Sequence, residues 1–474
     1  MTDPKLRNFS IRVITWNVAG TSPTENLRNL LGVRKPFDKN SLPDLYAVGY
    51  QEVSMRPRNV LSEMLLEQEW ITPLRQILAE LDYVKLISYR LQGLVLAIFV
   101  RRMHLHHIRN IYSTCVRTGV LGSWGNKGAS IVSLRAYGAS MSFTNSHLAA
   151  HDHGYKRRLG DYAAIATTAW CGPNGCYILD HDYVFWFGDL NFRLDERITI
   201  DDLRKAIKDE AVMEMLQYDQ LHRAQRDEDA FETMTEGKIS FKPTFKYQTG
   251  TTDFRLKTRR PAWTDRILYR CNEDTYQGNK FDITAHEYRS HEDYVQSDHK
   301  PVSALFTVKV FSNDTVFDRV YFFNTSDWSI SRGFELWFCT PTNAQPQNLD
   351  WIGLMQENFT TLDKYLAYIW VDTRPMDTIS FPDDENPILP TPRHVYRQTF
   401  SDQMVVLPGT YQLVYFRSKC DVLGVSDPFK YETDLIEEVI MYLSVFERDL
   451  LLLMRQSKQT IDTMGELRTF VESH

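Results

Sequence analysis

Short runs of aromatic and β-branched residues that end in acidic, amide or histidine side chains recur between Arg12 and about Val310. Three such endings are GDLN at 188–191, PAWTDR at 261–266 and SDHKP at 297–301. Runs of this composition are typical of buried β-strands. Strand ends can direct polar side chains into a cleft without loosening the core. The sequence therefore predicts a hydrolytic site suited to phosphate at the ends of strands.

The chain has 474 residues, which is more than a single hydrophobic core usually organises, so we expect two or three domains. Its formal net charge of −7 is mild for this length. Such a balance argues against attraction of the whole surface to nucleic acid or anionic lipid. Any anion must therefore be bound by a local group of cations.

The 6 cysteines form no CxxC pair and no regular framework, and the first ten residues lack the apolar core of a signal peptide. A reducing, cytoplasmic location is the resulting expectation. The longest apolar runs, such as LVLAIFV at 94–100, are far shorter than the roughly 20 residues that span a bilayer. Any contact with membrane is therefore expected to be peripheral.

The first part of the chain alternates strand-like runs with amphipathic helical segments. Helices are predicted at 60–81, 154–170 and 201–216. This mixture predicts an α/β fold in which two sheets face each other with helices outside, a four-layer sandwich at 10–308. The expected strands are 11–18, 44–53, 83–89, 93–100, 129–138, 141–148, 183–192, 263–270 and 301–308.

The rest of the chain has a different pattern. Aromatic alternation and turn signals at 312–432 predict an all-β sandwich. At 434–474 an apolar 3-4 spacing predicts an amphipathic helix, which either docks on its own domain or forms a coiled coil. The histidine-rich segment at 104–107 fits one exposed strand face better than a metal site.

Two strand ends offer oxygen ligands. Asn17 in TWNVAG and Glu52 in GYQEV each follow a strand-like run. An amide and a carboxylate suit a hard cation such as Mg²⁺, which keeps several waters that a phosphate can replace. Taken singly, each is more often a turn residue or a solvated acid. The prediction therefore depends on their occurrence together with the other polar residues at strand ends.

A general base is predicted at the end of the strand 183–189. Asp189 can take a proton from water while Asn191 holds that water in line with phosphorus. An Asx turn is the structural alternative. His147, after the strand 141–146, can donate to a phosphoryl oxygen, although a single histidine is more often structural. His151 and His153 are interpreted as loop residues.

Asp265 and the pair Asp298–His299 complete the predicted site. A carboxylate hydrogen-bonded to imidazole fixes its tautomer and favours its protonated form. Protonated His299 can then neutralise charge that develops on the phosphoryl group, while Asp298 faces the metal.

Basic residues for substrate selection occur in two segments. In 117–130, glycines permit a close backbone approach to an anion and Lys127 supplies a point charge. In 243–266, four cations precede or flank Asp265, and a solvated hairpin is the alternative interpretation of this charge run. The four are Lys246, Lys257, Arg259 and Arg260.

The order of these motifs resembles the inositol polyphosphate 5-phosphatase family. WNVAG, QEV, GNKG, HLAAH, FWFGDLNFR, KPTFKY, RRPAWTDRIL and SDHKPV follow one another over some 300 residues. The resemblance implies the fold of DNase I and the AP endonucleases. It also implies Mg²⁺-dependent removal of the 5-phosphate from phosphoinositides such as phosphatidylinositol 4,5-bisphosphate and 3,4,5-trisphosphate.

The same resemblance implies roles for single residues. Glu52 is implied as the metal ligand with Asn17 near it, and Asp265 and His299 as a coupled pair. Phosphate contacts are implied for His147 and Asn191, and water activation for Asp189. For the substrate, Asn126 and Lys127 are implied on the side of the 1-phosphate, and Lys246, Lys257 and Arg259 at the 4-phosphate.

One position departs from the family pattern. Many members have tyrosine before the lysine that corresponds to Lys246, whereas this chain has Phe245. The change removes a hydroxyl that can bond the 4-phosphate, so preference for 4-phosphorylated substrates is in question. Whether Tyr247 compensates is left open by the sequence.

The second domain resembles the SKICH domain, an immunoglobulin-like module, through DWIGL at 350–354, YLAYIW at 365–370 and VLGVSDPF at 422–429. In this family the domain implies recruitment to membranes or to protein partners. Self-association through 443–471 is a separate hypothesis. The resemblance and the composition together predict a cytoplasmic enzyme that associates peripherally with membranes and binds phosphoinositide headgroups. Binding of nucleic acid is not expected.

Two alternatives remain at this stage. A nuclease of the same fold should carry a long basic stripe, whereas here the cations form two local clusters. An inactive adaptor would bind phosphoinositide without releasing phosphate, although every predicted catalytic position holds a competent residue.

Overall fold

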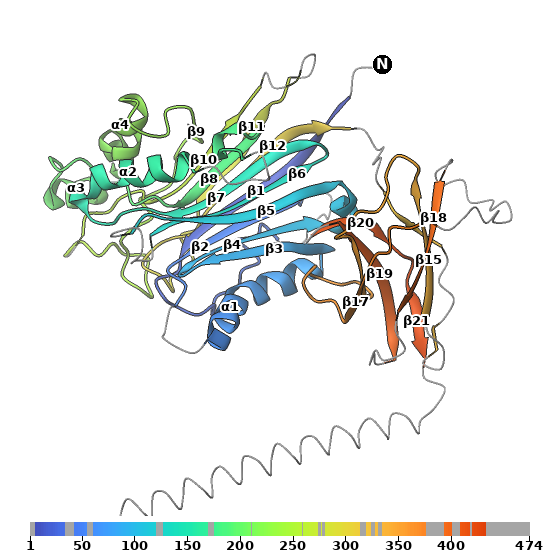
Figure 1. The fold of residues 1–474 in the computed structure, drawn as a ribbon. Helices are drawn as coiled ribbons and strands as arrows, with labels where there is room; N and C mark the ends of the chain where they lie inside the picture. The colour runs from blue at the N-terminus through green and yellow to red at the C-terminus, as the bar shows by residue number, and fades with distance from the viewer. Residues whose placement is uncertain are drawn as a thin grey trace, which may run out of the picture.

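The computed structural model describes residues 5–33, 42–54, 60–119, 127–168, 175–209, 211–257, 259–273, 276, 280–312, 319–323, 328–329, 334–375, 393–400, 408–417 and 420–432. The predicted helix at 434–474 and the predicted substrate residue Asn126 lie outside these residues. A larger α/β region is followed by a smaller all-β region (Figure 1).

The α/β region contains two six-stranded sheets. In spatial order, sheet A consists of β11 (Ile283–Ser290), β12 (Val302–Phe311), β1 (Leu6–Asn17), β2 (Leu45–Gln51), β4 (Leu94–Arg101) and β3 (Tyr83–Leu91). Sheet B consists of β5 (Ile108–Arg117), β6 (Gly128–Ala136), β7 (Ala139–His147), β8 (Tyr183–Asp189), β10 (Asp265–Cys271) and β9 (Thr235–Glu236). Because β1 pairs with β12 from Leu6 to Phe311, this region extends slightly beyond the predicted limits 10–308.

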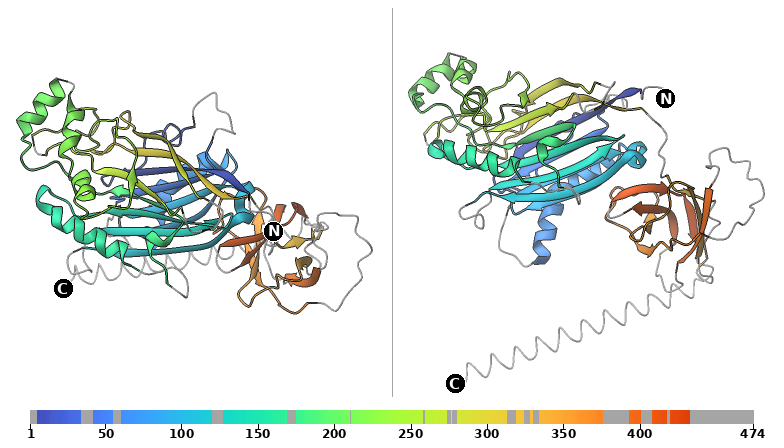
Figure 2. Two further views of the ribbon diagram at one scale, coloured as in Figure 1. Left: turned by 90° about the horizontal axis from the view of Figure 1, so that it is seen from above. Right: turned by 45° about the horizontal axis from the view of Figure 1, so that its top comes forward.

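Alternating apolar side chains give each sheet two buried faces. In β1, Ile11 and Val13 join the core between the sheets, while Ile14 and Trp16 join a second core under α1 (Val60–Ala79). The outer face of sheet B is covered by α2 and α4, whose bounds are Tyr155–Ala166 and Gln220–Arg226 (Figure 2). Burial on both faces explains the nearly continuous apolar runs of these strands.

Two parallel strand pairs bring polar residues to one edge of the sandwich. β1 runs parallel to β2, with Asn17 opposite Gln51, and β7 runs parallel to β8, with His147 opposite Asp189. Carboxyl ends of parallel strands meet at the same edge. The sheet pairing thus positions the residues that the sequence places at strand ends.

Some local predictions were wrong. The predicted strand at 104–107 is a 3₁₀ helix, η2 (Arg102–His107), in which His104 is buried with its Nε2 2.9 Å from Asp44 Oδ1. The predicted helix 201–216 is divided into α3 (Ile200–Lys208) and a 3₁₀ helix, η5 (Val212–Tyr218). Further 3₁₀ turns are η3 (Asp152–Gly154) and η4 (Ile178–Asp180).

The second region is all β. One of its sheets contains β13 (Tyr321–Phe322), β15 (Phe334–Pro341) and β18 (Arg393–Phe400). The other contains β14 (Trp328–Ser329), β21 (Phe429–Glu432), β19 (Gly409–Arg417), β16 (Trp351–Gln356) and β17 (Ala367–Trp370), with β20 (Asp421–Val425) paired to β19. An aromatic core that includes Phe338 and Tyr415 joins the two sheets. The all-β prediction for this region is confirmed.

The second region docks on the free edge of sheet A. The N–H of Lys85 in β3 donates to Thr360 O at 3.0 Å, and Leu362 N–H donates to Lys85 O at 3.2 Å. The ammonium of Lys85 lies 2.7 Å from Asp363 Oδ2. Phe359 is buried beneath Arg102, whose guanidinium carbon lies 4.6 Å from the ring centroid. The segment 359–363 therefore adds a short strand-like contact to an edge that would otherwise be open.

Two further observations bear on compartment and membrane contact. Cys176 is disulfide-bonded, whereas Cys115, Cys271 and Cys339 are free. This disulfide departs from the expectation of a chain without such bonds in a reducing compartment. No helix in the described ranges is long and apolar enough to cross a bilayer.

The buried contact at Phe359 gives a stability prediction. Phe359→Ala should lower the free energy of unfolding by about 3–5 kcal/mol, because it removes a buried ring and leaves a cavity between the two regions. Tyr368→Ala, at an exposed position of the same region, should change it by less than about 0.5 kcal/mol. Urea denaturation followed by circular dichroism measures both, and equal midpoints for the two variants would contradict the interpretation of this interface.

Candidate active site

A cavity of about 150 Å³ opens at the sandwich edge where β1, β2, β7 and β8 end. It combines acidic, basic and imidazole side chains from distant parts of the sequence. The residues that line it are Glu52, Lys127, His147, Ala150, His151, Asp189, Asn191, Arg193, Phe245, Lys246, Arg259, Asp298 and His299.

Asp189 is the buried acid of this cavity. Asn17 Nδ2 donates to Asp189 Oδ2 at 2.9 Å, and His147 Nε2 lies 3.2 Å from the same oxygen. Burial alone would raise the pKa of Asp189, but His147, His299 and Lys127 hold it well below its usual range. Asp189 is therefore ionised at neutral pH despite its burial.

The position of Asp189 depends on the glycine before it. Gly188 has a φ of +141°, and a Cβ there would lie 1.9 Å from the carbonyl oxygen of Ser146 on the neighbouring strand. Only glycine fits so close a backbone approach. Gly188 thus lets β8 stay paired with β7 up to the carboxylate of Asp189.

Asp265 and His299 form a buried pair beside Asp189. His299 Nδ1 lies 2.9 Å from Asp265 Oδ2, and the same oxygen accepts hydrogen bonds from the hydroxyls of Thr244 and Thr264 at 2.6 and 2.9 Å. Burial lowers the pKa of His299, but the carboxylates of Asp265, Asp189 and Asp298 outweigh it and raise the pKa to about 9. His299 is therefore an imidazolium at neutral pH.

The residues present fit a divalent cation. Potential ligand atoms of Asp189, Asp265 and His299 lie within 4.8 Å of one another, and His299 can offer its atom only as the neutral imidazole. Asp265 Oδ1 is buried and has no hydrogen-bond partner within the described part of the chain. Glu52 faces the same cavity with a 40% exposed side chain, and its Oε1 lies 3.8 Å from His147 Nε2. Such oxygen-rich donors suit a hard cation.

Cations lie around the acids. Lys127 Nζ contacts His147 Nε2, and Lys246 Nζ lies 2.5 Å from Asp298 Oδ2. Arg259 reaches the cavity from the segment after Phe254. Several cations around one small cavity make an environment that suits a phosphate group.

Arg193 is a cavity residue that the sequence interpretation missed. It is buried, its Nε donates to Asn191 O at 3.1 Å, and its Nη2 contacts Asn191 Oδ1. Its guanidinium carbon lies 4.6 Å above the ring of Phe245. Its place two residues after Asn191 in DLNFR was the available signal.

Phe245 occupies the centre of this cationic group. Its ring centroid lies 4.3 Å from that of His299, and Lys246 Nζ lies 5.1 Å from it. The hydroxyl of Tyr247 donates to Pro243 O at 2.8 Å, and Tyr247 is not one of the residues that line the cavity. Tyr247 therefore does not replace the hydroxyl that Phe245 lacks.

The structure brings most predicted site residues together. Asn17 and Asp265 lie behind the cavity wall, in direct contact with the lining residues Asp189 and His299. Lys257 is exposed and is not a lining residue, and Asn126 is outside the described ranges. Arg260 is used structurally, because its Nη2 lies 3.2 Å from Asp152 Oδ2. His151, interpreted as a loop residue, lines the cavity.

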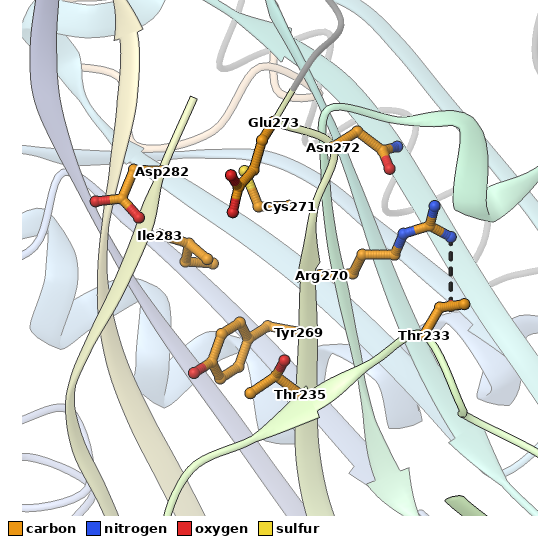
Figure 3. Close-up of a pocket in the computed structure, with 9 residues that line it drawn as sticks. All are labelled: Thr233, Thr235, Tyr269, Arg270, Cys271, Asn272, Glu273, Asp282 and Ile283. Carbon is orange, nitrogen blue, oxygen red and sulfur yellow. Dashed lines mark hydrogen bonds between the residues drawn. The ribbon is translucent and has the colours of Figure 1, made fainter. Parts of the chain in front are cut away.

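A larger cavity of about 730 Å³ lies elsewhere, near β9, β10 and β11 (Figure 3). Arg270 Nη1 donates to Thr233 Oγ1 at 3.3 Å and points away from the carboxylates of Glu273 and Asp282. Its polar side chains do not converge on a common point. The smaller cavity at the strand ends therefore remains the candidate site.

Two family models match this chain. Residues 14–305 match the Endonuclease/Exonuclease/phosphatase family 2, and residues 320–431 match the SKICH domain. The inositol polyphosphate 5-phosphatase domain of SpSynaptojanin, crystallised with inositol (1,4)-bisphosphate and a calcium ion, superposes with a TM-score of 0.56. It is 32% identical, and the match covers 65% of this chain and 86% of that chain.

Curated relatives match both regions. Inositol polyphosphate 5-phosphatase K of Mus musculus is 30% identical over 443 residues, which cover 90% of each chain. Phosphatidylinositol 4,5-bisphosphate 5-phosphatase A of Mus musculus is 32% identical over 437 residues, which cover 89% of this chain and 42% of that protein. The chain thus spans about two fifths of the length of this second relative.

The raised pKa of His299 predicts how stability depends on pH. The folded pKa of about 9 lies above the ordinary value of about 6.5, so stabilisation by the imidazolium is fully present below about pH 6.5 and is lost as pH rises through about 9. With a chelator present, the thermal midpoint of the wild type should fall over this window, and that of His299→Gln should fall less. His286→Gln, at an exposed histidine, is the control. Parallel curves for the wild type and His299→Gln would contradict the assignment.

Proposed function

Because the chain belongs to the inositol polyphosphate 5-phosphatase family and combines its catalytic domain with a SKICH domain, we propose that it hydrolyses the 5-phosphate of phosphoinositides. Phosphatidylinositol 4,5-bisphosphate and 3,4,5-trisphosphate are the proposed substrates. The observation that carries the proposal is the buried, ionised Asp189 beneath a group of cations in one small cavity. The proposed catalytic domain is 10–308, the SKICH domain 312–432 and the terminal helix 434–474.

In the proposed mechanism, Asp189 is the general base that removes a proton from the attacking water. Asn17 fixes its carboxylate through the 2.9 Å hydrogen bond, so that the basic oxygen keeps one orientation. Asn191 is held with a φ of +58° next to Asp189 Oδ1, which accepts from the Asn191 N–H at 3.1 Å. This contact is the Asx turn that the sequence offered as the structural alternative. The role of Asn191 in aligning the water with phosphorus is supported by its place in the cavity wall.

Charge that develops on the phosphoryl group is met by imidazole donors. His299, as an imidazolium held by Asp265, presents Nε2 4.0 Å from Asp189 Oδ2, close to the reacting centre. His147 Nε2 lies 3.2 Å from the same oxygen of Asp189. Preorganised donors of this kind are commonly worth about 3–4 kcal/mol each.

Mg²⁺ is the proposed cofactor, held by Glu52 with Asn17 and Asp298 near it. Within the described residues the carboxylate of Glu52 accepts no hydrogen bond and is partly open to the cavity, which supports this choice. The imidazolium form of His299 is a poor metal ligand, so the Glu52 side is favoured over the group Asp189, Asp265 and His299. When bound, the cation supplies charge neutralisation for the phosphoryl oxygens.

Substrate contacts are proposed for the surrounding cations. Asn126 and Lys127 are assigned to the 1-phosphate, and Lys246, Lys257 and Arg259 to the 4-phosphate. For Lys246 and Arg259 the support is their place in the cavity wall. Lys257 is exposed, so its assignment depends on a substrate that extends beyond the cavity.

We propose that the immunoglobulin-like SKICH domain recruits the enzyme from the cytoplasm to membranes or to protein partners. Among its described residues, five large apolar side chains are exposed, which is typical of an interaction surface. These are Leu349, Tyr365, Leu366, Tyr368 and Trp370. Self-association through the terminal helix stays a prediction. It would be contradicted if a chain ending near Glu432 sedimented in the same oligomeric state as the full chain.

Loss of the base tests the function. Asp189→Asn should lower phosphate release from dioctanoyl phosphatidylinositol 4,5-bisphosphate by about 10²–10⁴-fold, because it removes proton abstraction. A malachite green assay with Mg²⁺ measures this, and Asp201→Asn, at an exposed aspartate, is the control. If the wild type releases no phosphate, the result would favour the alternative of an inactive adaptor that only binds phosphoinositide. If the wild type cleaves plasmid DNA, the result would favour a nuclease.

A tyrosine at position 245 tests substrate preference. Phe245→Tyr adds a hydroxyl to the centre of the cationic group and should raise kcat/KM for 4-phosphorylated substrates by about 2–10-fold, the value of one hydrogen bond. For substrates without a 4-phosphate, kcat/KM should stay within about twofold. Equal changes for both classes would remove position 245 from recognition of the 4-phosphate.

The exposed aromatic surface tests recruitment. Replacing Leu366 and Trp370 together by alanine should weaken binding to vesicles of phosphatidylcholine with phosphatidylserine by roughly tenfold, because both apolar side chains are lost. Met103→Ala, at a 65% exposed position of the catalytic region, should leave binding unchanged. Co-sedimentation measures both, and retained binding by the double variant would direct the proposal to protein partners.

A further inference from the structure

His151 lies at the rim of the candidate active site, in a backbone conformation that the surroundings hold in place. Its φ is 75° and its ψ is 154°, values that non-glycine residues rarely adopt. The carbonyl oxygen of His151 accepts a hydrogen bond at 2.8 Å from the guanidinium of Arg158, which is fully buried. Arg158 also donates to Gln220 Oε1 at 2.7 Å. A strained backbone that is held this firmly is typical of functional positions.

The imidazole of His151 contacts a cation. Its Nδ1 lies 3.2 Å from Arg259 Nη2, and both side chains line the cavity. A guanidinium can only donate, so Nδ1 accepts and carries no proton in this arrangement. His151 is therefore held as the neutral tautomer protonated at Nε2.

The segment that carries Arg259 is itself fixed against the turn that carries His151. The neighbouring Arg260 donates to Asp195 O at 2.9 Å and to Ile198 O at 2.8 Å, and its Nη2 lies 3.2 Å from Asp152 Oδ2. The contact between His151 and Arg259 is therefore set by anchored backbone on both sides.

We propose that His151 is a further substrate-binding residue, which takes up a proton when a phosphate group on the inositol ring binds against Arg259. The phosphate oxygens accept the N–H groups of Arg259, so Nδ1 of His151 loses its donor. Nδ1 then gains one proton from solvent, and the imidazolium donates to the same phosphate. The inference rests on the proposed function, because it assumes a ring phosphate at Arg259, the one assigned to the 4-phosphate.

The charges around His151 set the direction of this linkage. Desolvation at the cavity rim, then the neighbouring cation Arg259, lowers the pKa of His151, and Arg193 and Lys127 lower it further. Asp152, the adjacent carboxylate, is already paired with Arg260. A phosphate dianion reverses the local sign of charge, so it raises the pKa of His151 and favours the protonated form.

The chain offers a matched control for His151. The imidazole of His153 stacks parallel to that of His151, with centroids 5.6 Å apart, but it is not one of the residues that line the cavity. Asparagine and histidine are both among the non-glycine residues enriched at positive φ, so the exchange changes the backbone cost little, and asparagine cannot take up a proton near neutral pH. His151→Asn and His153→Asn therefore test one position against the other with the same chemical change.

Titration calorimetry of the full chain with Mg²⁺ tests the proposal. Inositol 1,4-bisphosphate, which lacks a 5-phosphate, is titrated at pH 7 in Pipes and in Tris. Because the ionisation enthalpies of these buffers differ, the difference between the two binding enthalpies gives the number of protons taken up on binding. Inositol 1-phosphate is the ligand control. With the bisphosphate, the wild type should take up more protons than His151→Asn, and His153→Asn should keep most of the uptake of the wild type. The monophosphate should show no difference between the wild type and His151→Asn.

Kinetics give a second measurement. His151→Asn should raise KM several-fold at pH 6.5, this difference should shrink by pH 8.5, and kcat should stay within twofold at both values. Equal proton uptake in the wild type and His151→Asn, or equal losses in the two variants, would overturn the proposal. If the wild type released no phosphate from any inositol substrate, the proposed function itself would fail. An active enzyme whose proton uptake is unchanged by His151→Asn would overturn only the role of His151.

Discussion

The burial of two carboxylates side by side is the constraint on which this site depends. The antiparallel register of β8 and β10 places Asp265 directly opposite Asp189, and both side chains are buried. Two carboxylates buried on directly paired residues repel each other unless cations or hydrogen-bond donors compensate their charge. The imidazolium of His299, the amide of Asn17 and the hydroxyls of the neighbouring threonines provide this compensation.

The same constraint explains why the site needs the whole sandwich. Asn17 comes from sheet A, whereas Asp189 and Asp265 come from sheet B, so their contact requires the two sheets to pack in one relative position. The apolar core between the sheets holds that position. Trp16 adds a direct link, because its indole N–H donates to His299 O at 3.2 Å. The packing of the two sheets against each other therefore fixes the relative positions of Asn17, Asp189 and Asp265.

The sequence predicted those parts of the fold that have strong local patterns. Strands buried on both faces, such as β4 and β8, are continuous apolar runs and were predicted. β5 and β11 were missed, because their residues are mostly half-exposed and show no such run. The helix predicted at 201–216 ends at Lys208, where Asp209 leaves the helical conformation with a φ of −87° and a ψ of 8°, and the apolar periodicity continues across this point.

The motifs around Asp189 and His299 were enough to predict these two residues as members of the site. Contacts between segments that are distant in the sequence could not be predicted. The link between His151 and Arg259 joins positions 108 residues apart, and no local pattern distinguishes His151 from His153. The role of Arg193 against Phe245 likewise depends on a stacking geometry that appears only in three dimensions.

The docking of segment 359–363 on β3 has a consequence for how the chain can be divided. Sheet A ends at β3, whose outer backbone groups at Lys85 are paired by Thr360 and Leu362. A catalytic region cut away at Phe311 would leave this strand unpaired and would uncover the apolar surface under Phe359. Unpaired strands of this kind recruit other chains into intermolecular sheets. The segment 359–363 therefore keeps the edge of sheet A covered.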